Sequence, residues 1–248
     1  MKKFPWSPIL PLLFLFLSTG IHVVEPTFVE QMRHRVFDEY QRLKPRVYSN
    51  DIPVRILDID DESLSRVGQW PWPRTFVAQL VAQLANAGAA AIVFDIVFSE
   101  PDRTSPQYIV DLWPLTPEVE ALKENMGDLP DHDTVLADVI AQTPVITGFV
   151  LTGDPSLPRV PAQTASFAYG GDNPLDYLFG FQGAVANLEI LSENASGNGS
   201  FNLIAERDGI VRRVPMFVKL EGQPNPYPTL TAEVMRVIQG ARTYIIKT

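Results

Sequence analysis

The sequence predicts an α/β protein with a mixed, largely parallel sheet flanked by helices and preceded by one transmembrane helix. Three features support this prediction: an uncharged N-terminal stretch, an apolar strand–helix–strand pattern over residues 54–98, and further strands and helices beyond it. The chain has 248 residues, of which 46% are hydrophobic and 20% charged. This is the length and composition of an ordinary globular protein with a sizeable core.

The N-terminal stretch has the features of a membrane segment. Residues 4–24 contain no Asp, Glu, Lys or Arg, and Lys2 and Lys3 precede them. Because about twenty apolar residues span a bilayer core, residues 4–24 predict a transmembrane helix. Basic residues favour the cytoplasmic side, so residues 1–3 are expected inside the cell and residues 25–248 outside the cytoplasm. The alternative is a cleaved signal peptide, although no small-x-small cleavage motif follows the apolar stretch.

The segment after this stretch predicts a helix and then a strand–helix–strand unit. Apolar residues at helical spacing predict a helix over residues 28–43. Residues 54–59 form the first predicted strand, helices follow at 61–67 and 76–84, and the apolar run 89–98 is the second strand. A near-continuous apolar run is typical of a strand covered on both faces. The two strands are therefore expected to be parallel, with a right-handed connection.

The rest of the chain begins with an irregular, Pro-rich loop region over residues 101–130, which contains a short predicted helix near 118–123. Further helices are predicted at 131–141 and 229–239, and further strands at 145–151, 184–188, 201–205, 210–220 and 244–247. The chain stops inside the last element, which indicates a piece of a longer protein.

Charge and composition exclude several kinds of partner and cofactor. The formal net charge of -9 argues against nucleic acid. There is no cysteine, so disulfides, thiolate metal sites and a cysteine nucleophile are excluded. The three histidines are scattered and form no metal-ligand spacing with an acidic residue. The sequence therefore predicts no cofactor, no metal site and no catalytic residues.

Carboxylates follow the first two predicted strands at the point where each ends. Asp58 and Asp60 end the first strand, and Asp95, Glu100 and Asp102 end the second. Because the carboxyl ends of parallel strands share one edge, and ligands of α/β sheets bind at that edge, these side chains are expected to converge. Arg74 is close enough in sequence to act as their counter-charge.

Each of these residues also has a structural interpretation. Asp60 can cap the helix that follows it. Asp95 interrupts an apolar strand, so it is expected to be buried and paired with Arg74 or loop amides. Trp70 and Trp72, in a Pro-rich turn, either cover the edge of the core or stack on a ligand. The candidate ligand-binding residues are Asp58, Asp60, Trp70, Trp72, Arg74, Asp95 and Glu100.

Two short segments, Trp70-Pro71-Trp72-Pro73-Arg74 and Phe98-Ser99-Glu100-Pro101-Asp102, carry a family resemblance. With Asp58-Ile59-Asp60-Asp61 before them, they resemble the CHASE family of the second type, the cyclase/histidine-kinase-associated sensory extracellular domains. The resemblance covers roughly residue 37 to the C-terminus.

The resemblance implies the sensory input domain of a receptor in the bacterial inner membrane, with the domain in the periplasm. Its output would be an adenylate or guanylate cyclase, a histidine kinase of a two-component system, or a serine/threonine kinase, none of which lies in this chain. The chain itself would not be an enzyme. Its partners would be the bilayer, an unknown small-molecule or periplasmic signal, and a second copy in a homodimer, since most oligomers are symmetric dimers.

The competing interpretation is an enzyme. The strand ending in Asp58-Ile59-Asp60 resembles the Asp-x-Asp start of Mg-dependent haloacid-dehalogenase-like phosphatases, which would act here in the periplasm. That family needs a flexible turn where this chain has Asp61-Glu62, and a later lysine in a context that Lys123 does not provide.

Overall fold

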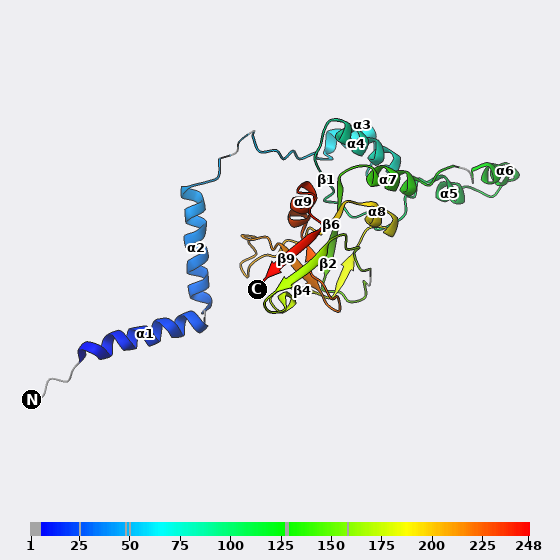
Figure 1. The fold of residues 1–248 in the computed structure, drawn as a ribbon. Helices are drawn as coiled ribbons and strands as arrows, with labels where there is room; N and C mark the ends of the chain where they lie inside the picture. The colour runs from blue at the N-terminus through cyan, green and yellow to red at the C-terminus, as the bar shows by residue number, and fades with distance from the viewer. Residues whose placement is uncertain (1–5, 25, 48, 50, 127–128, 158) are drawn as a thin grey trace, which may run out of the picture. The chain divides into compact units, whose positions relative to one another are not determined.

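The computed structural model describes residues 6–24, 26–47, 49, 51–126, 129–157 and 159–248 (Figure 1). The chain divides into an N-terminal unit, residues 1–59, and a C-terminal unit, residues 60–248. Of the candidate site residues, only Asp58 belongs to the N-terminal unit.

The N-terminal unit contains helices α1 (Trp6–Val24) and α2 (Thr27–Leu43). The helix predicted over residues 4–24 therefore forms from Trp6 onward, and residues 4 and 5 lie outside the described residues. The helix predicted over residues 28–43 is confirmed as α2. Within the part of the chain that the structure describes, no helix is both long and apolar enough to cross a membrane.

The strand predicted over residues 54–59 is wrong. This segment carries no secondary structure and pairs with no other strand among the described residues. Val54, Ile56 and Leu57 are exposed. The alternating apolar pattern favours an extended backbone, but a strand also needs a hydrogen-bonded neighbour, and none is present here.

The helices of the C-terminal unit follow the predicted positions closely. They are α3 (Asp61–Val67), α4 (Arg74–Asn86), α5 (Pro106–Ile109), α6 (Pro117–Met126), α7 (His132–Ala141), α8 (Glu189–Asn194) and α9 (Leu230–Ile238), with the short 3₁₀ helices η1 (Val110–Leu112) and η2 (Pro174–Asp176). Helix α7 begins at His132, one residue after the predicted start, because Asp131 is its N-cap. Of these, α5, α8, η1 and η2 have no counterpart in the predicted elements.

The strands of this unit are mostly short. They are β1 (Ile92–Val93), β2 (Val145–Thr152), β3 (Ser166–Gly170), β4 (Gly180–Phe181), β5 (Gly183–Val185), β6 (Gly197–Ser200), β7 (Phe217–Leu220), β8 (Tyr227–Pro228) and β9 (Thr243–Lys247). The run predicted as a strand over residues 89–98 forms only β1, and the run 210–220 forms only β7.

The described strands form three sheets rather than one largely parallel sheet. In the main sheet β2 pairs in parallel with β1 and β6 through its first half, and antiparallel with β5 through its second half. A second sheet is the parallel pair β3–β9, and a third has the order β4–β7–β8, with one parallel and one antiparallel pairing. The mixed α/β class is confirmed, whereas the prediction of a single, largely parallel sheet is not, because β2 changes partners along its length.

Two hydrophobic cores flank β2. The first lies where α4, α7 and α8 meet β1 and the start of β2, and it contains the fully buried Val81, Leu136, Ile140, Val145 and Leu191. The second joins the end of β2 to β5, β7 and β8 through Phe149, Leu151, Ala184, Val218, Leu220 and Tyr227. Strand β2 therefore connects the helical side of the unit to its second and smaller core.

Strand β6 lies just before the strand predicted at residues 201–205, which does not form. Its sequence, Gly-Asn-Gly-Ser, has none of the apolar pattern of a strand. The glycines are required because α9 lies close: a Cβ at Gly199 would lie 2.7 Å from the Cα of Leu230, and one at Gly197 would lie 2.6 Å from the Glu233 side chain. Close approach of another backbone is a known reason for glycine within a strand.

Candidate functional site

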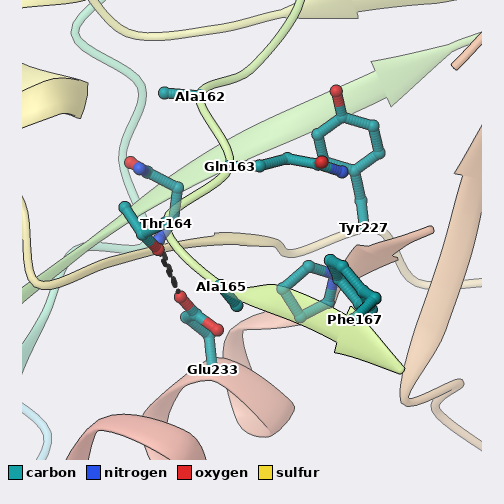
Figure 2. Close-up of a pocket in the computed structure, with 9 residues that line it drawn as sticks. Ala162, Gln163, Thr164, Ala165, Phe167, Tyr227 and Glu233 are labelled. Carbon is teal, nitrogen blue, oxygen red and sulfur yellow. Dashed lines mark hydrogen bonds between the residues drawn. The ribbon is translucent and has the colours of Figure 1, made fainter. Parts of the chain in front are cut away.

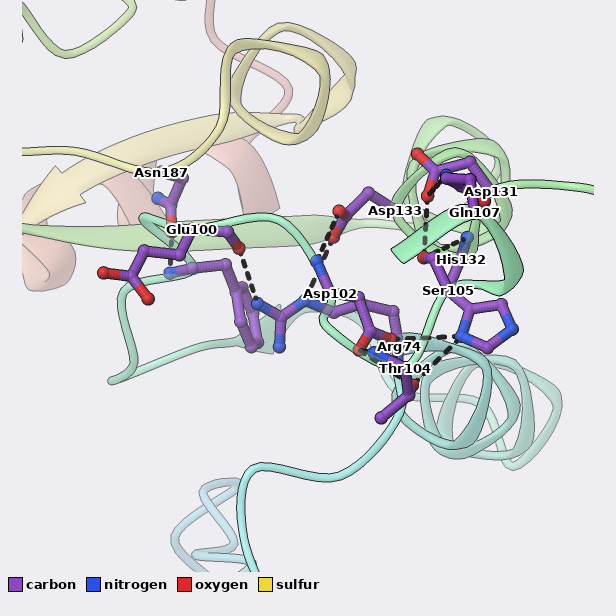
Figure 3. A network of polar contacts seen from close by, with 11 residues as sticks. Arg74, Glu100, Asp102, Thr104, Ser105, Gln107, Asp131, His132, Asp133 and Asn187 are labelled. Atoms are coloured by element: carbon purple, nitrogen blue, oxygen red, sulfur yellow. Dashed lines mark hydrogen bonds and ion pairs between the residues drawn. The ribbon is translucent and has the colours of Figure 1, made fainter. Parts of the chain in front are cut away.

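Arg74, the first residue of α4, is buried at the centre of a polar network (Figure 3). Its backbone N–H donates to Asp102 Oδ2 at 2.7 Å, and its Nε donates to Asp133 Oδ1 at 3.2 Å. Its Nη2 donates to the carbonyl oxygen of Glu100 at 3.2 Å, and the guanidinium carbon lies 4.4 Å from the centroid of the Phe98 ring. Arg74 thus connects α4 to the loop after β1 and to the start of α7.

The two carboxylates beside Arg74 are linked to each other and to their own loops. The backbone N–H of Asp102 donates to Asp133 Oδ2 at 2.8 Å. Asp102 Oδ1 accepts from the N–H and the hydroxyl of Thr104, both at 2.8 Å, and His132 Nδ1 lies 3.2 Å from Asp102 Oδ2. We refer to Arg74, Asp102, Thr104, His132 and Asp133 as the Arg74 cluster.

Neighbouring carboxyls in the Arg74 cluster have pKa values shifted in opposite directions. Burial alone would raise the pKa of Asp102, but the hydrogen bonds from Arg74, Thr104 and His132 lower it below its ordinary value. Burial raises the pKa of Asp133, because it outweighs the hydrogen bond from the Asp102 amide and the charge of Arg74.

The tryptophan turn before α4 packs against the first core. Trp72 is buried and its Nε1 donates to the carbonyl oxygen of Gly68 at 2.8 Å. Trp70 is half-buried, packs against the first core and lies edge-on to Trp72, with 5.7 Å between the ring centroids. This geometry favours the interpretation in which the turn covers the core, and it leaves only part of Trp70 accessible to a ligand.

The predicted pairing of Arg74 with Asp95 is wrong, and so is the predicted burial of Asp95. Asp95 is exposed because β1 ends at Val93, so the residue lies beyond the strand instead of within it. Among the described residues the counter-charge of Arg74 is Asp133. Glu100 contacts Arg74 only through its backbone carbonyl, and its residue is exposed.

Of the two earlier acidic residues, Asp60 belongs to the C-terminal unit and makes other contacts. Asp60 caps α3, accepting from the Ser63 N–H at 2.9 Å and from the Ser63 hydroxyl at 2.7 Å. These hydrogen bonds lower the pKa of Asp60. Asp58 is exposed and belongs to the N-terminal unit. Of the candidate set, the C-terminal unit therefore brings Arg74 into contact with the backbone of Glu100 and Trp70 into contact with Trp72.

A second polar centre, which the sequence interpretation missed, surrounds Glu233 on α9, and Figure 2 shows its contact with Thr164. Its fully buried carboxylate accepts from Thr164 Oγ1 at 2.8 Å, Arg236 Nη2 at 2.7 Å, Arg236 Nε at 2.9 Å and the Tyr244 hydroxyl at 2.7 Å. The backbone N–H of Asn198 adds a longer contact at 3.3 Å. We refer to these five residues, Thr164, Asn198, Glu233, Arg236 and Tyr244, as the Glu233 cluster.

The Glu233 cluster joins the second sheet to the main one. Tyr244 belongs to β9, whereas Asn198 belongs to β6 and its side chain also bonds to Thr147 of β2 and to the carbonyl oxygen of Ser192. Burial and the hydrogen bond to Glu233 raise the pKa of Tyr244 above its usual range, and the hydrogen bond to Glu233 raises the pKa of Arg236. A recess beside this cluster is too narrow to hold a water molecule. Its lining is Ala162, Gln163, Thr164, Ala165, Phe167, Asn198, Tyr227, Pro228 and Glu233.

Sequence signals for both missed centres exist in hindsight. Asp133 and His132 stand in the first turn of a predicted helix, where an acidic residue normally indicates only a favourable interaction with the helix dipole. Glu233 and Arg236 are three residues apart in α9, whose other residues are apolar except for Thr231, and this spacing allows an ion pair on one helix.

The chemistry of a metal-dependent phosphatase finds no support in this arrangement. Asp60, which would hold the metal or act on phosphate, is used as a helix cap. Among the residues whose placement is described, no group of three His, Cys, Asp or Glu side chains could hold a metal ion.

The comparison with protein families identifies the class. The model of the CHASE2 domain family matches residues 9–247, nearly the whole chain. The chain belongs to the CHASE2 domain family, whose members are extracellular sensory domains and not catalytic ones. The family predicted from the tryptophan turn and the Phe-Ser-Glu-Pro-Asp segment is thereby confirmed. No curated protein and no solved structure matches this chain.

Proposed function

We propose that this chain is the extracytoplasmic sensory input domain of a bacterial transmembrane signalling receptor. The observation that carries the proposal is the family match over residues 9–247. The signal would be a small molecule or another periplasmic species, and the output would be a cyclase, a histidine kinase or a serine/threonine kinase joined to this domain.

The proposed anchor is the N-terminal segment, which would hold the domain on the inner membrane. Support comes from the sequence: residues 4–24 carry no charged side chain, and Lys2 and Lys3 stand on the side expected to remain in the cytoplasm. Residues 25–248 would then lie in the periplasm.

The geometry divides the candidate ligand-binding residues into two groups. Arg74 and Trp72 are buried, and their side-chain donors already have hydrogen-bond partners within the domain. We therefore assign them a structural role. Asp95, Glu100 and part of Trp70 remain accessible in the C-terminal unit and are the residues we propose for contact with the signal. Asp58 and Asp60 are also exposed, with Asp60 occupied as a cap.

A pair of reporter fusions tests the topology on which the proposal depends. An alkaline phosphatase, which is active only outside the cytoplasm, fused after Thr248 should be active, and a cytoplasm-only fluorescent reporter at the same position should be dark. A chain retained in the membrane fraction with Met1 intact would exclude a cleaved signal peptide. The reverse reporter pattern would overturn the proposal.

Ligand binding is tested separately by thermal unfolding of the purified chain against small molecules found in the periplasm. A ligand at 100 times its Kd should stabilise the fold by about 2.7 kcal/mol. Asp95→Asn and Glu100→Gln should abolish that shift while leaving the unliganded melting temperature unchanged. A shift that survives both substitutions would place the signal site elsewhere in the domain.

A further inference from the structure

Helices α5, η1 and α6 form an arm, residues 106–126, that projects from the rest of the C-terminal unit (Figure 1). The main contacts of these helices are with one another. Among the described residues, neither hydrophobic core of the unit contains a residue of the arm. Burial of apolar surface in these cores therefore does not hold the arm in place.

The two ends of the arm are joined at its base by hydrogen bonds (Figure 3). Asp131 Oδ1 accepts from the Ser105 hydroxyl and from Gln107 Nε2, both at 2.7 Å. The hydroxyl of Ser105, which is fully buried, accepts in turn from the backbone N–H of His132 at 3.0 Å. We refer to the hydrogen bonds between residues 102–107 and 131–133 as the clasp.

His132 contributes one ring nitrogen to the clasp. Its Nδ1 lies 3.2 Å from Thr104 Oγ1 and 3.2 Å from Asp102 Oδ2. The Thr104 hydroxyl donates its one proton to Asp102 Oδ1, so it can only accept from the ring, and an ionised carboxylate also only accepts. Nδ1 therefore carries a proton in this arrangement, whether the ring is neutral or charged, and the clasp needs a donor at that position.

The clasp lies where the arm can separate from the unit most easily. Local opening costs least where few apolar contacts are buried, and hinges are usually a few residues in loops or at the ends of elements. The clasp has both properties, because its contacts are polar and it includes the start of α7. The remainder of α7 is fixed in the first core through Leu136 and Ile140.

We infer that the arm is a hinged element, which the clasp holds in place and which moves as one body when the clasp opens, while both cores stay closed. Arg74 joins this hinge to the loop after β1, because its guanidinium binds Asp133 of the clasp and the carbonyl oxygen of Glu100. A signal that binds this loop more tightly when the arm is released would favour release, and release would favour binding to the same degree. This regulatory role rests on the proposed function, whereas the hinge itself does not.

Because the chain contains no cysteine, pairs of introduced cysteines can carry spin labels without background. Glu120→Cys on α6 with Asp138→Cys on α7 reports the position of the arm. Gln79→Cys on α4 with Asp138→Cys is the control pair, because α4 and α7 pack together in the first core. Pulsed electron–electron double resonance on the purified full chain should give one narrow distance distribution for each pair.

Substitution of Asp131 should release the arm without disturbing the first core. Asp131→Ala removes the acceptor that Ser105 and Gln107 share, and it removes no capping bond, because the Asp131 side chain makes none to α7. The distance distribution of the arm pair should at least double in width, whereas that of the control pair should not change. Asp131→Asn keeps the Oδ1 acceptor and should leave both distributions narrow.

Exchange of His132 tests the donor itself. The side-chain amide of Asn places a donor near the position of Nδ1, whereas that of Gln reaches the position of Nε2. His132→Asn should therefore keep the arm pair narrow, and His132→Gln and His132→Ala should broaden it as Asp131→Ala does. Equal behaviour of the Asn and Gln variants, narrow distributions in every variant, or equal broadening of the arm and control pairs would each overturn the inference. The measurement uses no ligand, so its failure leaves the sensory proposal standing.

Discussion

The Arg74 cluster and the Glu233 cluster both contain a buried arginine–carboxylate pair, but they are built in opposite ways. In the first, Arg74 lies at the centre: its guanidinium contacts Asp133, a carbonyl oxygen and an aromatic ring, and its backbone N–H donates to Asp102. In the second, an anion lies at the centre and accepts from donors on four other residues.

This difference determines how many contacts remain in each cluster after one side chain is removed. If Asp133 is removed, Arg74 still has the Glu100 carbonyl and the Phe98 ring. If Glu233 is removed, its donors lose their common acceptor, and Arg236 keeps the carbonyl oxygens of Ser196 and Ala241 and the Thr164 hydroxyl. Removal of a buried centre that several donors share should therefore be more damaging than removal of one partner from a distributed set.

The largest effect is expected for Glu233→Ala. Breaking a buried ion pair by removing one partner costs about 3–5 kcal/mol, and here Thr164, Asn198 and Tyr244 lose an acceptor as well. Urea unfolding of the purified chain should show a loss at the upper end of this range. Glu193→Ala, at an exposed position, is the control. A loss below about 1 kcal/mol, the net worth of one hydrogen bond, would show that the cluster is not a stabilising centre.

A smaller effect is expected at the Arg74 cluster. Asp133→Ala and Arg74→Ala should each lower the free energy of unfolding by about 3 kcal/mol, and the double variant should lose clearly less than the sum because the two residues contact each other. Asp95→Asn is the matched control and should leave stability unchanged, since Asp95 is exposed and does not pair with Arg74. Additive losses would contradict the ion pair.

The acid dependence of stability should distinguish the two carboxyls within the Arg74 cluster. The pKa of Asp102 is lowered in the folded state, so its contribution is present above the ordinary carboxyl value of about 4 and is lost as the pH falls below it. The pKa of Asp133 is raised, so its contribution is complete below about pH 4 and is lost as the pH rises through the folded-state value.

Substitution of each carboxyl should therefore change the pH profile in opposite directions. Asp102→Asn should make the loss of stability below pH 4 shallower, by at most about 1.4 kcal/mol per pH unit. Asp133→Asn should remove a gain in stability that the parent chain shows on acidification towards pH 4. Chemical unfolding at half-unit pH steps measures both slopes, and parallel profiles for the two variants would contradict the opposite shifts.

The smallest effect is expected for Tyr244→Phe, which removes one of the donors to Glu233 and keeps the aromatic packing against Phe167 and Phe217. The loss should be about 1 kcal/mol. Amide exchange should accelerate in β9 while β2 stays protected. Equal acceleration in both strands would show that β9 does not open separately from the main sheet.

The spacing of apolar residues predicted those helices and strands whose formation depends mainly on the local sequence. The helices α4, α7 and α9 and the strand β2 were predicted to within a few residues, because apolar spacing and helix caps encode them directly. Strand β6 could not be predicted this way, since its Gly-Asn-Gly-Ser sequence reflects the close approach of α9. The run at residues 54–59 has a strand pattern but no neighbour within the described residues, and a pairing partner is not a local property.

In the candidate site, too, the residues of a local motif could be predicted, whereas their partners from distant parts of the chain could not. The motif residues Arg74 and Trp72 were predicted to matter, and they do lie at structural junctions. The partner of Arg74 was assigned to Asp95 because the second strand was expected to continue through residue 98 and bury it, whereas β1 ends at Val93. Asp133, which is 59 positions from Arg74, is brought to it only by the packing of α7 against α4.

The burial of Asn198 has a practical consequence for production of this protein. Asn194-Ala195-Ser196 and Asn198-Gly199-Ser200 both match the acceptor pattern for N-linked sugar attachment. In the folded chain Asn194 is exposed, whereas the Asn198 amide is enclosed and committed to Thr147 and Ser192. In a eukaryotic secretory host a glycan could join Asn198 only before folding, and it would then occupy the space between β2, β6 and α8. Protein from such a host would contain a fraction that cannot complete its main sheet. Replacing Ser200 would remove the acceptor pattern at Asn198, but Ser200 is itself buried, so the substitution would disturb the same region.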